Sequence, residues 1–254
     1  MNTRGRRVEV VLIYQSLLGL YGDRGNATVL MKRLAWRGGY QPVLSLVEPG
    51  DPLPDSGDVY LIGGGEDAAQ VSAVRALKAD GGLYRAVDRG AAVLAVCAGY
   101  QIVGNSFMVG YKDDVISGLG LLDVTTRRGP VRAVGEIISR WNGRNGEEQW
   151  LTGFENHGGY TRLGPGAKPL ATVEIGVGNS GDGTEGAVAG TVIGTYPHGP
   201  VLARNPALAD HILQLALGHE LEPLVHPEIN KLRRQRLARV RRLHARNSLR
   251  VQSG

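Results

Sequence analysis

The sequence contains one cysteine, and its position favours covalent chemistry. Cys97 follows the apolar run Ala91–Val96, which predicts a buried β-strand, and precedes Ala98 and Gly99 at the start of a predicted helix. A strand that turns sharply into a helix exposes the side chain at the turn, as in the serine hydrolases. The positive end of the helix dipole favours a thiolate there. We therefore predict that Cys97 is a nucleophile; the alternative is a small buried cysteine that only closes the strand.

A thiol nucleophile needs a general base, which is usually a histidine. Of the six histidines, His157 and His198 each follow a predicted strand, whereas the other four lie on a predicted helix or near a basic tail. His198 directly follows the strand Val192–Tyr196, which could pair beside the strand of Cys97. Position therefore favours His198 slightly, and His157 remains the alternative. For either residue, the non-catalytic interpretation is a turn histidine held by hydrogen bonds.

Three consecutive glycines, Gly63–Gly65, follow another predicted strand. They do not have the spacing of a phosphate-binding loop, and the acidic Glu66 and Asp67 that follow would repel phosphate. Glycines do allow the close backbone approach that an oxyanion hole requires. We predict that the N–H group of Ala98 and backbone N–H groups of this glycine run stabilise an oxyanion. No group of histidine, cysteine and carboxylate residues has metal-ligand spacing, so no metal site is predicted.

Strands and helices alternate through the first hundred residues. The predicted strands are Val8–Tyr14, Pro42–Val47, Asp58–Ile62 and Ala91–Val96, and the predicted helices are Asn26–Arg37, Glu66–Lys78 and Gly82–Arg89. This alternation predicts an α/β fold with a mostly parallel sheet and helices on both faces.

The pattern changes between Gly118 and Tyr196, where short β-like pieces alternate with turns and no helix is evident. The pieces are Gly120–Thr125, Ala133–Ser139, Trp150–Phe154, Pro169–Val173, Gly186–Val188 and Val192–Tyr196. They predict an antiparallel β excursion on the same domain. Helices resume at Asn205–Leu217 and Glu228–Arg246. We divide the chain into a domain of residues 1–227 and a basic C-terminal helix or tail of residues 228–254.

Composition excludes several classes of protein. The single cysteine among 254 residues excludes a disulfide framework, and the longest apolar run has only eight residues, too few for a membrane helix. The net charge of +5 arises in the tail: the nine basic residues from Lys231 onward leave 20 basic and 24 acidic residues elsewhere. The body therefore offers no electrostatic argument for nucleic acid. We predict a cytoplasmic protein.

The tail allows three interpretations. Ile229, Leu232, Val240 and Leu243 form an apolar stripe at helical spacing, with arginines elsewhere. The first interpretation is a solvated helix packed by one edge. The others are a docking helix for an acidic partner surface and attraction to anionic lipid headgroups at the inner face of the membrane.

Several motifs together resemble a known family. Cys97–Gln101 (CAGYQ), with the preceding glycines and His198, is similar to the class I (triad) glutamine amidotransferases. The motifs Phe154–Gly159 (FENHGG) and Gly194–Pro200 (GTYPHGP) resemble their cobyric-acid-synthase-like branch, and within it the GatD subunits of lipid II isoglutaminyl synthase. The resemblance extends from Tyr21–Asn26 (YGDRGN) to about residue 226.

This resemblance implies a glutaminase. Cys97 would attack the side-chain carboxamide of glutamine, and His198 would protonate the departing ammonia and then activate water against the thioester. Arg132 matches the arginine that holds the glutamine α-carboxylate in this family, unless it is a surface arginine like its neighbours. Ala98 and Gly64 would supply the N–H groups that stabilise the oxyanion. Gln101 and Tyr100 would line the glutamine pocket.

The resemblance also implies a partner. Ammonia would pass to a MurT-like Mur ligase subunit in a heterodimer. That ligase would use ATP and Mg²⁺ to amidate the D-glutamate α-carboxylate of the lipid II stem peptide to D-isoglutamine in peptidoglycan biosynthesis. This chain itself would need no cofactor, and no nucleic acid or membrane span is expected. The alternatives are a non-catalytic scaffold or binding subunit of the same fold and a glutaminase for corrinoid amidation.

Two positions depart from the family pattern. Ala95 stands where glycine commonly lies two residues before the cysteine, which is a mild change. Pro200 stands where typical triads have a glutamate two residues after the histidine. We therefore expect either a Cys–His dyad or an acid that the partner donates across the interface.

Overall fold

A six-stranded sheet forms the centre of the molecule. The computed structural model describes residues 5–19, 22–110, 114–143 and 148–252. The strand order is β11-β12-β4-β3-β1-β2, with β11 antiparallel to β12 and every other pair parallel. The strands are β1 (Arg6–Ile13), β2 (Tyr40–Val47), β3 (Val59–Ile62), β4 (Ala92–Val96), β11 (Ala187–Ala189) and β12 (Val192–Thr195). The predicted parallel sheet is confirmed.

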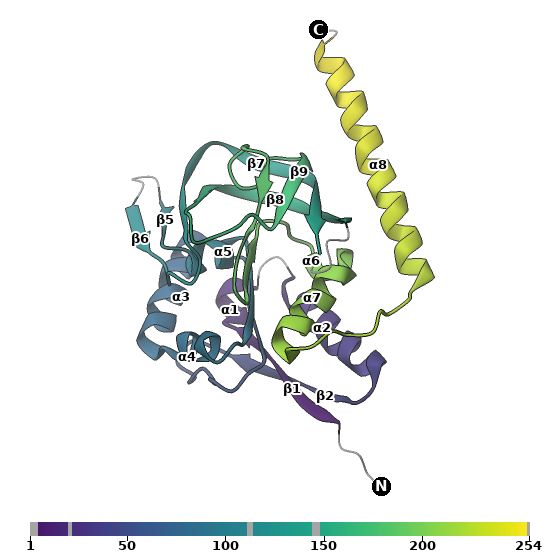
Figure 1. Cartoon of the computed structure of the whole chain (residues 1–254). Helices are drawn as coiled ribbons and strands as arrows, with labels where there is room; N and C mark the ends of the chain where they lie inside the picture. Colours follow the sequence, from purple (N-terminus) through teal and green to yellow (C-terminus); the bar gives the residue numbers. More distant parts are fainter. Residues whose placement is uncertain (1–4, 20–21, 111–113, 144–147, 253–254) are drawn as a thin grey trace.

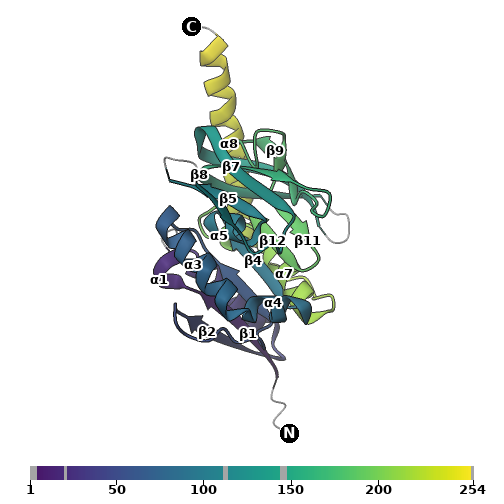
Figure 2. The ribbon, with the colours of Figure 1, turned by 90° about the vertical axis from the view of Figure 1, so that its left-hand side faces the viewer.

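Helices cover both faces of this sheet, as predicted (Figure 1). The central strands β3 and β4 are buried along their whole length, which explains their continuous apolar sequences. α2 and α7 lie on one face, and α1, α3 and α4 lie on the other (Figures 1 and 2). The helices of the body are α1 (Gln15–Leu18), α2 (Arg24–Arg37), α3 (Asp67–Asp80), α4 (Gly82–Asp88), α5 (Ala98–Val103), α6 (Val201–Arg204) and α7 (Pro206–Leu217).

A second, mostly antiparallel sheet lies beyond the ends of β4 and β12 (Figure 2). Its main feature is the long hairpin of β7 and β8, whose register shifts between Arg128 and Ala133. The strands are β5 (Ser106–Val109), β6 (Asp114–Ser117), β7 (Val124–Asn142), β8 (Glu148–Leu163), β9 (Ala171–Ile175) and β10 (Thr184–Glu185). This sheet is the predicted antiparallel excursion.

The excursion differs from the prediction in detail. Residues 106–109 and 114–117 form a hairpin that the sequence did not indicate, because each strand has only four residues. The predicted strand Gly120–Thr125 begins only at Val124. Residues 187–189 and 192–195 belong to the central sheet, where β11 pairs with β12 and β12 pairs in parallel with β4, so their assignment to the excursion was wrong. The expected position of β12 beside the strand of Cys97 is confirmed.

The last helix, α8 (Pro227–Gln252), packs on the second sheet along one edge and then projects from the body (Figure 1). Val240 is buried with Ile138 and Ile175, and Trp150 packs against them. Arg241 pairs with Glu174 at 2.6 Å and stacks on the ring of Trp150. In the described part of the chain, no helix is long and apolar enough to span a membrane. The division at residue 228 stays a prediction, and residues 253–254 lie outside the described chain.

Candidate active site

The predicted turn from strand to helix is present at Cys97. Its backbone has φ 52° and ψ −103°, a conformation that is strained for any residue with a side chain. Among the described residues, only Tyr14 is a second non-glycine with positive φ. The Gly99 N–H donates to the Gly63 carbonyl at 3.0 Å, and a Cβ on Gly99 would lie 2.4 Å from the Ile62 oxygen. Gly99 therefore lets the turn pack directly against the end of β3.

His198 reaches the same region from the neighbouring strand. The Cys97 N–H donates to the Thr195 carbonyl at 2.8 Å, which fixes the end of β12 beside the turn. His198 follows three residues later, and its N–H donates to the Phe154 carbonyl of β8 at 2.9 Å. Its side chain is buried. Cys97 and His198 thus follow adjacent parallel strands, as expected.

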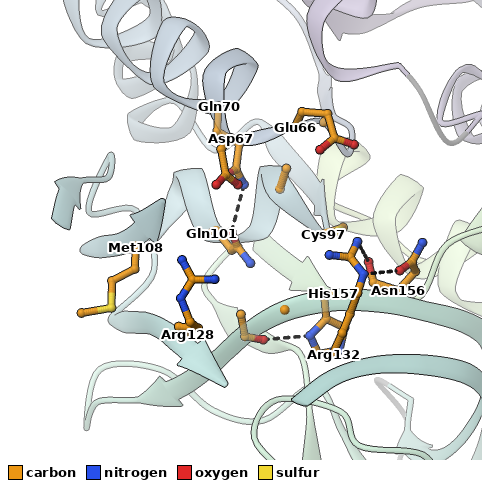
Figure 3. A pocket seen from close by; sticks show the side chains of 14 residues that line it. Glu66, Asp67, Gln70, Cys97, Gln101, Met108, Arg128, Arg132, Asn156 and His157 are labelled. Atoms are coloured by element: carbon orange, nitrogen blue, oxygen red, sulfur yellow. Dashed lines mark hydrogen bonds between the residues drawn. The ribbon is translucent and has the colours of Figure 1, made fainter. Parts of the chain in front are cut away.

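A cavity of about 160 Å³ opens at Cys97, between the parallel sheet and the β7/β8 hairpin (Figure 3). It is lined by Gly65, Glu66, Asp67, Gln70, Cys97, Ala98, Gln101, Met108, Arg128, Arg132, Asn156, His157, Gly158 and Gly159. Cys97, Ala98, Gln101 and Arg132 were predicted for the site, and the structure brings them together. Within the described chain, His198 and Gly64 lie outside this lining.

Arg132 lies where the β7/β8 register shifts, and the irregular backbone directs its side chain to the cavity. Its Nε donates to the Asn156 side chain at 2.8 Å, and its terminal nitrogen donates to the Asn156 carbonyl at 3.4 Å. Figure 3 shows the guanidinium and Asn156 together beside Cys97. A fixed, exposed guanidinium is suited to binding a carboxylate in two-point fashion.

His157 forms part of the cavity wall and stacks on Tyr196, with ring centroids 3.7 Å apart. Its Nδ1 lies 2.8 Å from the Gly159 carbonyl, and its Nε2 lies 3.8 Å from the Glu155 carboxylate.

Burial lowers the pKa of His198 to about 4, and the charges of His157 and Arg132 act in the same direction. His198 is therefore neutral at pH 7 and can accept a proton.

The thiol of Cys97 is less acidic than its place at a helix start suggests. Burial raises its pKa to about 12, and the negative charges of Asp23 and Glu66 contribute. Hydrogen bonding to the Ala98 backbone and the charge of Arg132 act in the opposite direction. The expectation of a stabilised thiolate was therefore wrong, because desolvation outweighs the effect of the helix start.

The remaining predicted residues have mixed outcomes. The N–H of Gly64 donates to the Asp23 carboxylate at 2.8 Å, so its role as an oxyanion donor stays a prediction. Tyr100 does not line the cavity: it is fully buried, and its hydroxyl donates to Asn179 at 3.1 Å. Helical geometry explains this error, because Tyr100 and Gln101 point in directions about 100° apart.

Sequence reasoning missed Asp23, Gln70 and Asn156. Gln70 of α3 donates to the Gln101 side chain at 2.9 Å, and Gln101 donates to the Tyr196 hydroxyl at 3.3 Å. Asp23 and Asn156 lie inside the motifs already singled out, although Tyr21 of the first motif lies outside the described residues. No motif in the sequence around Gln70 indicated that it belongs to the site. Over the described residues, no group of three or more His, Cys, Asp or Glu side chains is placed to hold a metal ion.

The parallel sheet, the cysteine turn and the adjoining glycine loop together form a glutamine amidotransferase architecture. Residues 9–206 match the CobB/CobQ-like glutamine amidotransferase domain, and the chain belongs to this family. It is 33% identical to the GatD subunit of lipid II isoglutaminyl synthase (glutamine-hydrolyzing) from Staphylococcus aureus strain N315, over 84% of this chain and 86% of that protein. The resemblance expected from the motifs is confirmed.

A second relative and a solved structure agree with this assignment. The GatD subunit from Streptococcus pneumoniae strain R6 is 31% identical over 83% of this chain and 81% of that protein. A crystal structure of a glutamine amidotransferase, 22% identical in sequence, superposes with a TM-score of 0.53 over 81% of this chain and 98% of that chain. At this identity the superposition shows the fold alone.

Proposed function

We propose that this chain is the glutaminase subunit of a two-protein amidotransferase that modifies lipid II in peptidoglycan synthesis. The proposal rests on the position of Cys97, which occupies a strained turn and lines the same cavity as Arg132. The names of the GatD relatives, which specify a glutamine-hydrolysing subunit of lipid II isoglutaminyl synthase, support the choice of substrate and pathway.

The reaction begins when glutamine enters the cavity. Arg132 binds the α-carboxylate, and the Cys97 sulfur attacks the carboxamide carbon of the side chain. The Ala98 N–H stabilises the oxyanion; its backbone already contacts the thiol. His198 takes the thiol proton and delivers it to the departing ammonia, which leaves a γ-glutamyl thioester. His198 then activates water, and hydrolysis releases glutamate and regenerates the thiol.

The ammonia passes to a MurT-like ligase subunit, which carries ATP and Mg²⁺ and amidates the D-glutamate α-carboxylate of the stem peptide. The acid that orients the histidine in typical triads is replaced by Pro200, which packs against the backbone of Gly25. His198 therefore acts either with Cys97 alone or with an acid from the ligase. An acid donated by the ligase would prevent wasteful hydrolysis of glutamine in the free subunit.

The test is ammonia release from glutamine by the purified chain, alone and with a co-expressed MurT-like ligase. Activity that Cys97→Ala abolishes, by at least about 10³-fold, supports the glutaminase. Strong stimulation by the ligase supports an acid donated at the interface, whereas equal rates with and without the ligase exclude it. If no Cys97-dependent activity arises even with the ligase and its lipid substrate, the chain is a non-catalytic scaffold.

A further inference from the structure

One oxygen of the Asp23 carboxylate is directed away from the helix that Asp23 precedes. Asp23 is the N-cap residue of α2, where an aspartate ordinarily accepts a hydrogen bond from the first turn of its own helix. The Asp23 side chain makes no such capping bond; its Oδ1 accepts the side-chain amide of Asn26, at 3.5 Å. Its Oδ2 instead accepts the N–H of Gly64 at 2.8 Å, in the loop after β3. The carboxylate thus joins the start of α2 to the glycine loop beside the cysteine turn.

This carboxylate is buried and tightly enclosed. Asp23 is 2% exposed, and a Cβ on Gly63 would lie 2.7 Å from its Oδ2. Burial raises the pKa of Asp23 to about 6, and the hydrogen bond from Gly64 partly offsets this effect. Burying a carboxylate is costly unless hydrogen bonds compensate it. A residue that only capped α2 would not need to be buried in this way.

The position of Asp23 also affects the thiol. Burial is the largest cause of the raised pKa of Cys97, and the negative charge of Asp23 is the second largest. The same carboxylate therefore opposes formation of the Cys97 thiolate and occupies the Gly64 N–H. Both of these effects oppose the reaction proposed above.

We propose that Asp23 is a positioning residue that holds the free chain in a low-activity state by retaining the Gly64 N–H, which the active site needs for the oxyanion. The proposal rests on the glutaminase function proposed above. In the active complex this hydrogen bond breaks, the loop after β3 turns its N–H toward the cavity, and Gly64 joins Ala98 as a donor. Gly65 and Glu66 already line the cavity, so only a small local movement is required.

The decisive experiment measures glutamine hydrolysis by the Asp23→Ala variant of the full chain without a ligase. One oxyanion-hole donor is worth about 10²–10³ in kcat, so we expect kcat to rise at least about tenfold, with little change in KM. The stimulation by the MurT-like ligase should shrink correspondingly. A purely structural role for Asp23 would instead lower kcat or leave it unchanged, and either result would overturn the proposal.

A second variant separates the hydrogen bond from the charge and remains informative if Asp23→Ala does not fold. Asp23→Asn keeps an acceptor oxygen for Gly64 but removes the negative charge. Alkylation of Cys97 by iodoacetamide at pH 8 should accelerate several-fold, while kcat should rise less than in Asp23→Ala. Amide hydrogen exchange at Gly64 should be slow in the wild type and in Asp23→Asn. Unchanged alkylation, or an unprotected Gly64 amide in the wild type, contradicts the proposal.

Asp58 provides a matched control. Its carboxylate also accepts a backbone N–H of the central sheet, that of Glu9 at 2.7 Å, and it precedes the same strand β3. Asp58→Ala should leave kcat and Cys97 alkylation unchanged. Cys97→Ala distinguishes the two levels of the argument. If Cys97-dependent hydrolysis is present but unaffected by Asp23→Ala, only the role of Asp23 fails; if it is absent from every preparation, including the complex, the glutaminase function fails as well.

Discussion

The binding side of the cavity, formed by Arg132 and Asn156, differs from the reacting side, formed by the Cys97 turn and the adjoining Gly64 loop. The difference is how closely each side already has the arrangement that the reaction needs. On the binding side, Asn156 fixes the Arg132 guanidinium by two hydrogen bonds, and the guanidinium faces the cavity. On the reacting side, burial raises the pKa of Cys97 to about 12, and the Gly64 N–H is engaged by Asp23. Glutamine could therefore bind before the chemistry is possible. This order suits a subunit whose ammonia is useful only when a ligase is present.

The two sides are also built differently. The reacting side depends on backbone geometry: Gly99 packs so closely against the end of β3 that it leaves no room for a Cβ. The binding side depends on side-chain hydrogen bonds at an irregular part of a hairpin. We therefore expect substitutions in the cysteine turn to reduce kcat and stability, and those on the binding side to change KM.

The largest effect is expected from Gly99→Ala. Its Cβ would lie 2.4 Å from the Ile62 carbonyl, so the cysteine turn must move. A displacement of about 1 Å at a catalytic group can cost about 10² in rate, and overpacking typically destabilises by about 1–3 kcal/mol. We expect both losses in ammonia release and thermal unfolding. Gly135→Ala is the control, because its Cβ meets nothing within 4 Å. Normal activity of Gly99→Ala would show that the turn is not rigid.

The binding side is tested by Arg132→Ala. Loss of a charged hydrogen-bonding group should raise the KM for glutamine by about 10- to 100-fold, with kcat in the saturated complex within a few-fold of the wild type. Arg132→Lys should fall between, because lysine keeps the charge but not the two-point geometry. Arg140→Ala, an exposed arginine on the same strand, is the control. A fall in kcat at unchanged KM would mean that Arg132 acts in the chemical step and not in the binding of glutamine.

Sequence predicts the cysteine turn better than the hydrogen bonds around it, for a physical reason. The turn at Cys97 depends on a contiguous apolar strand, a small residue and a glycine, and all three are visible locally. The hydrogen bonds of Asp23 to Gly64 and of Gln70 to Gln101 join segments 41 and 31 residues apart. Pairings of this kind depend on the assembled fold, and no local pattern encodes them.

The same distinction holds for the fold. The parallel sheet was predicted because buried strands are continuous apolar runs separated by helices. The hairpin of β5 and β6 was missed because its strands are short and partly exposed. β12 was first assigned to the wrong sheet, because its sequence resembles any buried strand and only its partner decides its place.

The pH dependence of Cys97 alkylation measures the pKa of the thiol on the reacting side. A thiol whose pKa is raised to about 12 is protonated at pH 7. As long as the pH stays below the pKa, each increase of one pH unit raises the thiolate fraction about tenfold. The iodoacetamide rate in the free chain should therefore keep rising from pH 7 to about pH 10 without a plateau. Because Cys97 is the only cysteine, Cys97→Ala gives the background. A plateau below about pH 8.5, the ordinary pKa of a cysteine, would mean that the thiol is already activated and would remove the contrast between the two sides.

The smallest effect is expected from Asn156, which acts only through Arg132. Asn156→Ala removes the acceptor 2.8 Å from the Arg132 Nε but leaves the backbone carbonyl in place, so KM should rise only about two- to tenfold, in line with one net hydrogen bond. Asn156→Asp should raise KM further, because its carboxylate would compete with that of glutamine for the guanidinium. Asn142→Ala, on an exposed position of β7, is the control. If Asn156→Asp bound glutamine as well as the wild type, Arg132 would not be the residue that holds the α-carboxylate.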